Sequence, residues 1–580
     1  MASFADKTVY QIYPKSFQDT TGDGFGDLRG VTEHLDYLAN LGVDYLWLTP
    51  FFVSPQADGG YDIADYRAID PAFGTMEDFE GLAAQARERG MGIMLDMVLC
   101  HTSAEHEWFQ RALAGDERYQ RYYILRDGRG STGPGDPGEP PTNWQAAFGG
   151  SMWEWEPRLG KWYLHMHDVS QPDLDWTNPE VRRECADVVR FWRDKGVSGF
   201  RFDVVSLISK PDVFEDSLGT GRADISDGPH VHEYLQELVR EAGIDGMLTV
   251  GEMAASSLEN CIRYTRPEDH ELGMTFSFHH LKVDYKDGDK WSLMAPDIAR
   301  LQELFATWQE KMQAGGGWNA LFWDNHDQPR ALSRFADDGE LRVPSAKMLA
   351  LVGDLMRGTP YIYQGDELGM ANSHFTGIDD YRDVESLNYE RILREERGMS
   401  AEEALAVVNE RSRDNGRLPM QWDADAENAG FCQGEPWLPQ AKDAPGCDQA
   451  QIAASAEVDD PDSVLAFYRE LVRMRHEMPV IATGKVKFLD ADAVPVISYA
   501  RFGELPVGER WDAATAEDED MLAPGSLLVV GNFSDAPAPL GEDVCRLLDA
   551  GEWNVLLSGY GDYAGERTLR PYEGVVFRRA

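Results

Sequence analysis

The amino-acid sequence predicts an α/β protein: a closed (β/α)8 barrel with an inserted subdomain after the third strand and a C-terminal antiparallel β domain. Short apolar runs bounded by Gly, Pro or Asp alternate with amphipathic stretches such as MEDFEGLAAQARERG, eight such runs can be counted, and near residue 492 the pattern changes to short alternating strands. The runs are Val9–Tyr13, Val43–Leu48, Met91–Val98, Gly199–Asp203, Met247–Gly251, Gly273–Phe278, Ala320–Trp323 and Thr359–Tyr363.

The spacing of these runs predicts the domain boundaries. A long gap rich in Gly, Pro and Trp separates the third run from the fourth, which indicates an inserted subdomain over residues 101–167. The segments VPVISYARF, SLLVVGNFS, WNVLLSG and GVVFRRA follow one another without long helices. We therefore expect the barrel over residues 1–100 and 168–490, and a C-terminal β-sandwich over residues 491–580.

Composition narrows the class of protein. The chain has 580 residues and a formal net charge of −47, which disfavours a general role on nucleic acid or an anionic membrane surface. Hydrophobic residues make up 43% of the chain, which is typical of a globular protein rather than a disordered one. The N-terminus carries no signal-peptide pattern, and no run of 18 apolar residues occurs. We expect a cytoplasmic protein, a monomer, with neither a nucleic-acid nor a membrane partner.

The cysteines fit neither a disulfide framework nor a zinc site, because they are scattered without a CxxC pair. A reducing compartment suits this pattern. The six are Cys100, Cys185, Cys261, Cys432, Cys447 and Cys545.

Polar side chains follow several of the predicted strands at the rim where barrel enzymes carry their active sites. A single carboxylate at such a place is more often a helix cap or an ion-pair partner. Several carboxylates, two histidines and an arginine converging on one rim favour a catalytic site instead. These residues are Asp96, His101, Arg201, Asp203, Glu252, Asn325, His326 and Asp327.

Two of these carboxylates suit glycoside hydrolysis, which needs an acid for the leaving oxygen and, in retaining enzymes, a nucleophile about 5–5.5 Å away. Asp203 and Glu252 end the fourth and fifth runs, which are neighbouring strands in a barrel. Arg201 lies two residues before Asp203 and shares its strand face, so we expect it to keep Asp203 ionised. Asp327 could bind sugar hydroxyls from the far side.

These segments resemble the motif regions of the α-amylase superfamily of glycoside hydrolases, and YQIYPKSFQDTTGDGFGDLRG resembles its oligo-1,6-glucosidase branch. The resemblance covers nearly the whole chain. It implies that Asp203 is the nucleophile, Glu252 the general acid/base and Asp327 the transition-state stabiliser. As the acid, Glu252 should have a raised pKa. It further implies contacts with the sugar in the −1 subsite from Asp58, Tyr61, His101, Phe148, Arg201, His326 and Arg413.

The substrate expectation rests on the same resemblance. Within the branch, TVGEMAASSLENCIRY, MTFSFHHLKVDYKDGDKW and TPYIYQGDELGM resemble members that act on a phosphorylated disaccharide. They imply a retaining, exo-acting hydrolase that splits trehalose 6-phosphate into glucose and glucose 6-phosphate through a covalent glucosyl-Asp203 intermediate. The preferred phosphate ligands are Lys282 and Lys290. On composition alone an ordinary solvated loop is as good an interpretation, because three aspartates balance the three lysines there.

A metal site is expected near the N-terminus, and no organic cofactor is. The loop after Gln18 places oxygen donors on alternate residues with glycines between them, as Ca²⁺ requires, and similar loops in this branch bind calcium. The alternative is an Asp/Gly-rich turn without an ion. We expect a structural Ca²⁺ held by Asp19, Thr21, Asp23, Phe25 and Asp27.

Three alternative functions stay open. One is an unphosphorylated α-1,6-glucosidase acting on isomaltose or short isomaltooligosaccharides, one is a sucrose or trehalose isomerase on the same scaffold, and one is a non-enzymatic sugar-binding relative. Val204, directly after Asp203, resembles members that do not favour α-1,4 linkages. Cys100 stands where the family usually has Asn, and a buried thiol is a better interpretation of it than a nucleophile.

Overall fold

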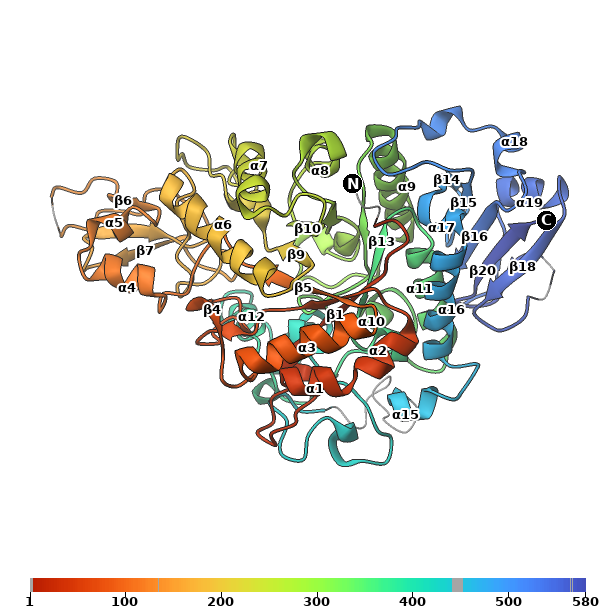
Figure 1. Cartoon of the computed structure of the whole chain (residues 1–580), viewed down its shortest axis with the longest axis horizontal. Helices are drawn as coiled ribbons and strands as arrows, with labels where there is room; N and C mark the ends of the chain where they lie inside the picture. The colour runs from red at the N-terminus through yellow and green to blue at the C-terminus, as the bar shows by residue number, and fades with distance from the viewer. Residues whose placement is uncertain (1–3, 134, 441–451, 564, 566) are drawn as a thin grey trace.

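The barrel is formed by eight parallel strands around one axis (Figure 1). The computed structural model describes residues 4–133, 135–440, 452–563, 565 and 567–580. Strand order is β11-β10-β9-β5-β2-β1-β13-β12, and a parallel bridge between Thr275 and Asn319 joins the two outer strands. The predicted TIM barrel and its eight strands are thereby confirmed. The strands are β1 Val9–Ile12, β2 Tyr45–Leu48, β5 Gly92–Met97, β9 Gly199–Phe202, β10 Leu248–Met253, β11 Met274–Ser277, β12 Ala320–Leu321 and β13 Thr359–Tyr363.

Helices cover the outside of this sheet, each burying one stripe of apolar side chains. Helix α3 begins at a capping box between Thr75 and Asp78 and buries Phe79 and Leu82 toward the barrel. The covering helices are α1 Leu28–Glu33, α2 Leu35–Leu41, α3 Met76–Glu88, α6 Pro179–Asp194, α7 Val231–Ala242, α8 Leu258–Thr265, α9 Ile298–Gly315, α11 Arg342–Asp354 and α16 Val464–Glu477. They do not all begin with a cap like that of α3, since α2, α7 and α11 have no side-chain cap hydrogen bond.

The inserted subdomain lies between β5 and α6. It contains α4 (Glu107–Leu113), α5 (Glu117–Gln120) and a three-stranded sheet in the order β6-β8-β7. Isolated bridges from His101 to Asp173 and from Tyr123 to Leu174 continue the subdomain past residue 167. The strands are β6 Leu125–Arg126, β7 Trp153–Glu156 and β8 Lys161–Leu164.

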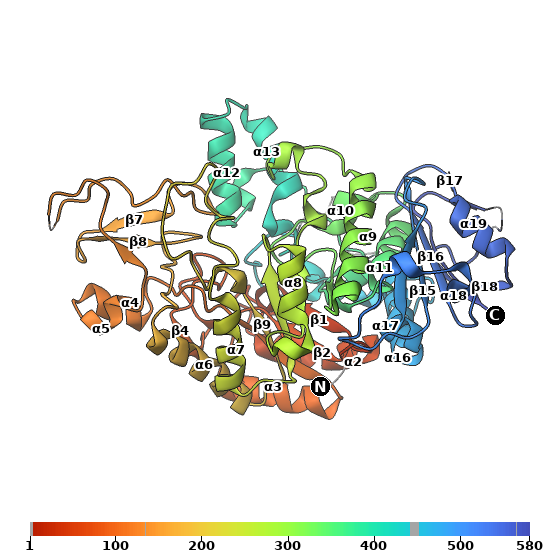
Figure 2. The same cartoon turned by 90° about the horizontal axis from the view of Figure 1, so that it is seen from above.

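A helical pair that the sequence pattern did not predict follows β13. Helices α12 (Val384–Glu395) and α13 (Ala401–Arg411) pack against each other (Figure 2). Ser400 and Glu403 form a capping box at the start of α13, and Asp383 caps α12. This segment brings charged residues to the barrel rim.

The C-terminal domain is antiparallel, as predicted. Its five-stranded sheet has the order β14-β15-β16-β20-β18, and a two-stranded sheet pairs β17 with β19. The sheet begins at Lys485, ahead of residue 491, because β14 pairs with β15 along its whole length. Helix α19 (Glu542–Asp549) also lies in this domain. The strands are β14 Lys485–Leu489, β15 Val496–Phe502, β16 Leu527–Asn532, β17 Ala538–Pro539, β18 Trp553–Ser558, β19 Thr568–Leu569 and β20 Gly574–Arg579.

Two further expectations concern the whole chain. Across the described ranges, none of the helices combines the length and the apolar character that crossing a membrane needs. Five of the cysteines are described and all five are free, whereas Cys447 lies outside the described residues.

Candidate active site

A cavity of about 490 Å³ opens at the carboxyl ends of the barrel strands, under the inserted subdomain and α12. Ten of the twelve residues predicted for catalysis or substrate binding line it. The other two, Arg201 and His326, are buried and contact lining carboxylates. The ten are Asp58, Tyr61, His101, Phe148, Asp203, Glu252, Lys282, Lys290, Asp327 and Arg413.

Arg201 is the centre of the first cluster of charges. Its Nη1 donates to Asp203 Oδ1 at 2.5 Å and to Asp96 Oδ1 at 2.7 Å, and its Nη2 contacts Glu252 Oε2. Strands β9 and β10 are paired, so Asp203 and Glu252 end adjacent strands as predicted. One guanidinium therefore orients both carboxylates that a retaining glycosidase needs.

Burial dominates the electrostatics of this cluster. It raises the pKa of Glu252 to about 7 and that of Asp203 to about 7, while Arg201 acts in the opposite direction on both. The raised pKa of Glu252 confirms the expectation for the acid. The expectation that Arg201 keeps Asp203 ionised is corrected, because desolvation outweighs the attraction of the guanidinium and raises the pKa of Asp203. Three carboxylates share one cation here, so the cluster retains a proton near neutral pH.

Asp327 is the centre of a second cluster and stays ionised. Its Oδ1 accepts from Arg413 Nη1 at 3.1 Å and from Arg417 Nη2 at 2.9 Å, and His326 Nε2 lies 3.1 Å from Oδ2. Despite burial, these neighbours hold the pKa of Asp327 well below its usual range. Tyr61 stacks on His326 with ring centroids 5.1 Å apart. A permanent negative charge therefore faces the cavity beside the raised-pKa pair.

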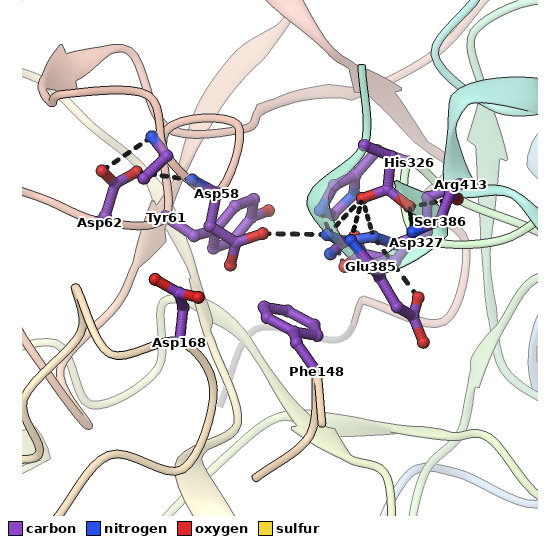
Figure 3. A network of polar contacts seen from close by, with 12 residues as sticks. Asp58, Tyr61, Asp62, Phe148, Asp168, His326, Asp327, Glu385, Ser386 and Arg413 are labelled. Carbon is purple, nitrogen blue, oxygen red and sulfur yellow. Dashed lines mark hydrogen bonds and ion pairs between the residues drawn. The ribbon is translucent and has the colours of Figure 1, made fainter. Parts of the chain in front are cut away.

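The inner end of the cavity is closed by an ion pair. Arg413 Nη2 donates to Asp58 Oδ1 at 3.0 Å and to Asp383 Oδ1 at 2.6 Å, and the ring of Phe148 lies 4.8 Å from the guanidinium carbon (Figure 3). Gln171 Nε2 reaches both Asp58 Oδ2 at 3.1 Å and His101 Nε2 at 3.2 Å. Asp58, Arg413 and Phe148 thus form one wall of the cavity.

Three further cations, Lys282, Lys290 and Arg222, line the cavity. Lys290 Nζ is paired with Glu385 Oε2 at 2.6 Å. Lys282 Nζ donates to the Ala254 carbonyl at 2.9 Å, and Arg222 donates to the carbonyl of Ala146 at 2.6 Å. Within the described part of the chain, neither Lys282 nor Arg222 has a carboxylate partner at ion-pair distance. Both charges are available to an anionic ligand.

Several residues of the site were missed from the sequence. Arg417 lies four residues after Arg413 in the motif RSRDNGRLPMQW. The sequence pattern did not predict the turn at Arg413–Asn415, after which both guanidinium groups contact Asp327. Arg222, Asp383 and Glu385 follow no predicted strand, so the strand-end signal could not find them.

Cys100 is buried and inert in this structure. Burial raises the pKa of its thiol to about 12, and Lys210 Nζ lies 3.6 Å from Sγ. Lys210 also pairs with Asp173 at 2.7 Å. The buried-thiol interpretation is thereby supported over a nucleophile, because a nucleophilic cysteine needs a depressed pKa.

The predicted metal loop lies outside the active-site cavity. Asp19 accepts from the backbone N–H groups of Thr21, Gly22 and Gly24 at 2.7–2.8 Å, and Asp27 accepts from Gly30 at the start of α1. These bonds order the loop, and Asp19 Oδ1 and both Asp27 oxygens each accept two or more of them. Asp19 Oδ2 accepts one, from Gly24, and has a lone pair left for an ion. The Ca²⁺ site stays a prediction.

Comparisons with known proteins agree with this geometry. Residues 11–484 match the model of the alpha amylase catalytic domain. Trehalose-6-phosphate hydrolase of Escherichia coli (strain K12) is 48% identical, covering 98% of this chain and 97% of that protein. Oligo-1,6-glucosidase of Parageobacillus thermoglucosidasius is 41% identical, covering 99% and 98%. The crystal structure of Bacillus licheniformis trehalose-6-phosphate hydrolase superposes with a TM-score of 0.89 at 44% identity, covering 100% and 99% of the two chains.

Proposed function

Because the chain belongs to the alpha-amylase family of glycoside hydrolases, we propose that it hydrolyses trehalose 6-phosphate to glucose and glucose 6-phosphate with retention of configuration. The observation that carries the substrate is that two cations without a carboxylate partner, Lys282 and Arg222, line the cavity of a chain of net charge −47. A phosphate on the leaving glucose would meet them there. The names of the relatives at 46–48% identity support the same substrate.

The reaction divides into two displacements. Glu252 gives its proton to the glycosidic oxygen while the Asp203 carboxylate attacks C1, so a C1–O bond to Asp203 forms as the bond to the leaving sugar breaks. Glu252, now a carboxylate, takes a proton from water, and the hydroxide attacks C1 and releases Asp203. Arg201 orients both carboxylates, and Asp327 binds hydroxyls of the distorted sugar.

The closed inner end supports the release of one terminal glucose. Asp58 and Arg413 would contact the hydroxyls of that glucose farthest from the scissile bond. Phe148 packs on the guanidinium from the side of the inserted subdomain, which holds the wall in place. We propose a small phosphorylated disaccharide as the substrate on this basis. The cytoplasmic location and the monomeric state stay predictions.

The substrate preference tests the proposal. We expect kcat/KM for trehalose 6-phosphate to exceed that for trehalose and for isomaltose by about 100-fold, roughly 2.7 kcal/mol, because the phosphate is bound by two unpaired cations. The measurement is kcat/KM for the three substrates in one buffer. A preference for isomaltose would favour the oligo-1,6-glucosidase alternative instead.

The cation itself can be tested with a matched control. Lys282→Met should lower kcat/KM for trehalose 6-phosphate by about 30-fold and leave p-nitrophenyl α-glucoside, which has no phosphate, nearly unchanged. Lys286→Met is the control, because Lys286 lies exposed in the same loop and outside the cavity lining. Equal losses in both variants, or on both substrates, would contradict a phosphate contact at Lys282.

A further inference from the structure

A second cavity of about 250 Å³ lies behind the wall that closes the active site. Asp58 and Arg413 line both cavities, one from each side. The proposed mechanism uses none of the side chains that face only the second cavity. Those that matter here are Tyr13, Lys15, Phe25, Gln56, Arg382 and Trp437.

Lys15 is a buried cation with unused hydrogen-bond donors. The side chain is 9% exposed and lies over the rings of Trp437 at 4.3 Å and Phe25 at 5.2 Å. Its one polar contact is a long one, 3.5 Å to Gln56 Oε1, and across the described ranges no carboxylate reaches ion-pair distance of it. An ammonium group has three N–H donors. The two aromatic rings stabilise its charge, but they do not accept conventional hydrogen bonds from all three N–H groups. A buried charge whose donors lack acceptors is costly, so an additional acceptor would stabilise Lys15.

Gln56 supplies a second unused donor on the same cavity. Its Nε2 is buried and finds no partner within the described residues. Its backbone has a φ of 63°, a left-handed conformation that is costly for glutamine. Bonds from Ala57 N to Asp62 and from Gln56 N to Ser54 Oγ hold this turn in place. The turn therefore fixes the amide beside Lys15.

The other charges around the cavity are already paired, with one exception. Arg413 and Arg417 bind Asp383 and Asp327, and Asp414 accepts the backbone N–H of Asp383. Arg382 instead donates to the carbonyls of Asp379 and Tyr381, and it has no carboxylate at ion-pair distance in the described part of the chain. Lys15, Gln56 and Arg382 thus present donors without anionic partners.

We propose that this cavity is a binding site for a phosphate monoester of a small sugar, separate from the active site. The phosphate oxygens would accept from Lys15, Gln56 and Arg382, and the C–H face of the sugar ring would pack on Tyr13 and Trp437. The identification of the sugar rests on the proposed function, because glucose 6-phosphate is the product that has this chemistry. The anion site itself rests on the donors alone.

Occupancy of this site should reach the active site through the shared wall. A phosphate beside Arg382 and Lys15 contacts the side of the wall opposite to the sugar that Asp58 and Arg413 bind. Any change that the ligand makes in this pair alters sugar binding, and the coupling is reciprocal. Glucose 6-phosphate is also the first product to leave the glucosyl-enzyme, which by itself makes its inhibition mixed. The contribution of this cavity is therefore the part of the inhibition that depends on Lys15.

Isothermal titration tests the site without turnover. Glucose 6-phosphate, inorganic phosphate and glucose are titrated into the Asp203→Asn protein, with and without Lys15→Met or Lys282→Met. We expect two glucose 6-phosphate sites, of which Lys15→Met weakens one by about tenfold or more and Lys282→Met weakens the other. Glucose alone should not report the Lys15 site. Methionine preserves the unbranched stem over Trp437, and a thermal melt checks that the variant is folded.

A second variant and a kinetic measurement complete the design. Gln56→Gly removes the amide and suits the positive φ, so it should weaken the same site without loss of stability. Inhibition by glucose 6-phosphate should be weaker in Lys15→Met than in the native protein, although still mixed, because only the remote contribution is lost. A single glucose 6-phosphate site that is insensitive to Lys15→Met and to Gln56→Gly overturns the proposal. The titration measures binding and needs no hydrolysis of trehalose 6-phosphate. It therefore tests the Lys15 site even if the proposed function is wrong.

Discussion

Replacing Asp203 by asparagine is expected to lower kcat by about 10⁵-fold, because an amide cannot attack C1 and no covalent intermediate forms. The change is nearly isosteric, and Arg201 retains its contacts with Asp96 and Glu252. We therefore expect the thermal midpoint to change little. The measurement is kcat on trehalose 6-phosphate and on p-nitrophenyl α-glucoside, with a thermal melt of each protein.

Stereochemistry separates loss of a nucleophile from general damage to the site. In Asp203→Gly, azide can occupy the space of the lost carboxylate and attack C1 from the face opposite to the leaving group. The expected product is β-glucosyl azide, with configuration inverted. Residual hydrolysis within tenfold of the native rate, or azide rescue with retained configuration, would show that another group is the nucleophile.

The barrel was predictable because its signal is local and repeated. Each buried parallel strand is a short apolar run, such as Val9–Ile12, and eight runs separated by amphipathic helices leave few other architectures. The start of the C-terminal sheet was less predictable. The strand Lys485–Leu489 directly follows the last helices of the barrel, so its position in the chain does not assign it to a domain. Its pairing with Val496–Phe502 places it in the C-terminal sheet.

The site residues at the ends of barrel strands were predictable from the sequence, whereas those on long loops and on α12 were not. Asp203 and Glu252 follow apolar runs, so barrel geometry alone brings them together. Glu385 and Arg222 reach the cavity from α12 and from the loop after β9, and no periodicity in the sequence encodes the path of those segments. Their roles depend on tertiary packing, and only coordinates show it.

The pKa shifts of the carboxylates were also only partly predictable from the sequence. That Glu252 needs a raised pKa followed from its chemistry, and burial provides it. That Asp203 also has a raised pKa did not follow from Arg201 standing two residues away, because the depth of burial cannot be read from spacing. Asp327 shows the reverse balance, since His326 and then two arginines outweigh desolvation and hold its pKa well below the usual range.

Replacing Glu252 by glutamine should have the second large effect, and one that depends on the leaving group. With trehalose 6-phosphate the leaving group is glucose 6-phosphate, whose glycosidic oxygen needs a proton as the bond breaks, so we expect kcat/KM to fall by about 10⁴-fold. p-Nitrophenolate leaves without protonation, so formation of the glucosyl-enzyme should be nearly preserved with that substrate. The intermediate then accumulates, because no base activates water, and a burst of nitrophenol should precede slow turnover.

The pH profile and azide identify Glu252 as the group responsible. The native protein needs Glu252 protonated for the first step, and its pKa of about 7 means that kcat/KM should fall as pH rises above about 7. In Glu252→Gln with p-nitrophenyl α-glucoside that alkaline limb should disappear, because no titrating acid remains in the step. Azide should attack the glucosyl-Asp203 ester, release the carboxylate and give α-glucosyl azide, with configuration retained. An alkaline limb that persists in this variant would assign the acid to another carboxyl of the cluster, with Asp96, which also contacts Arg201, the first to test.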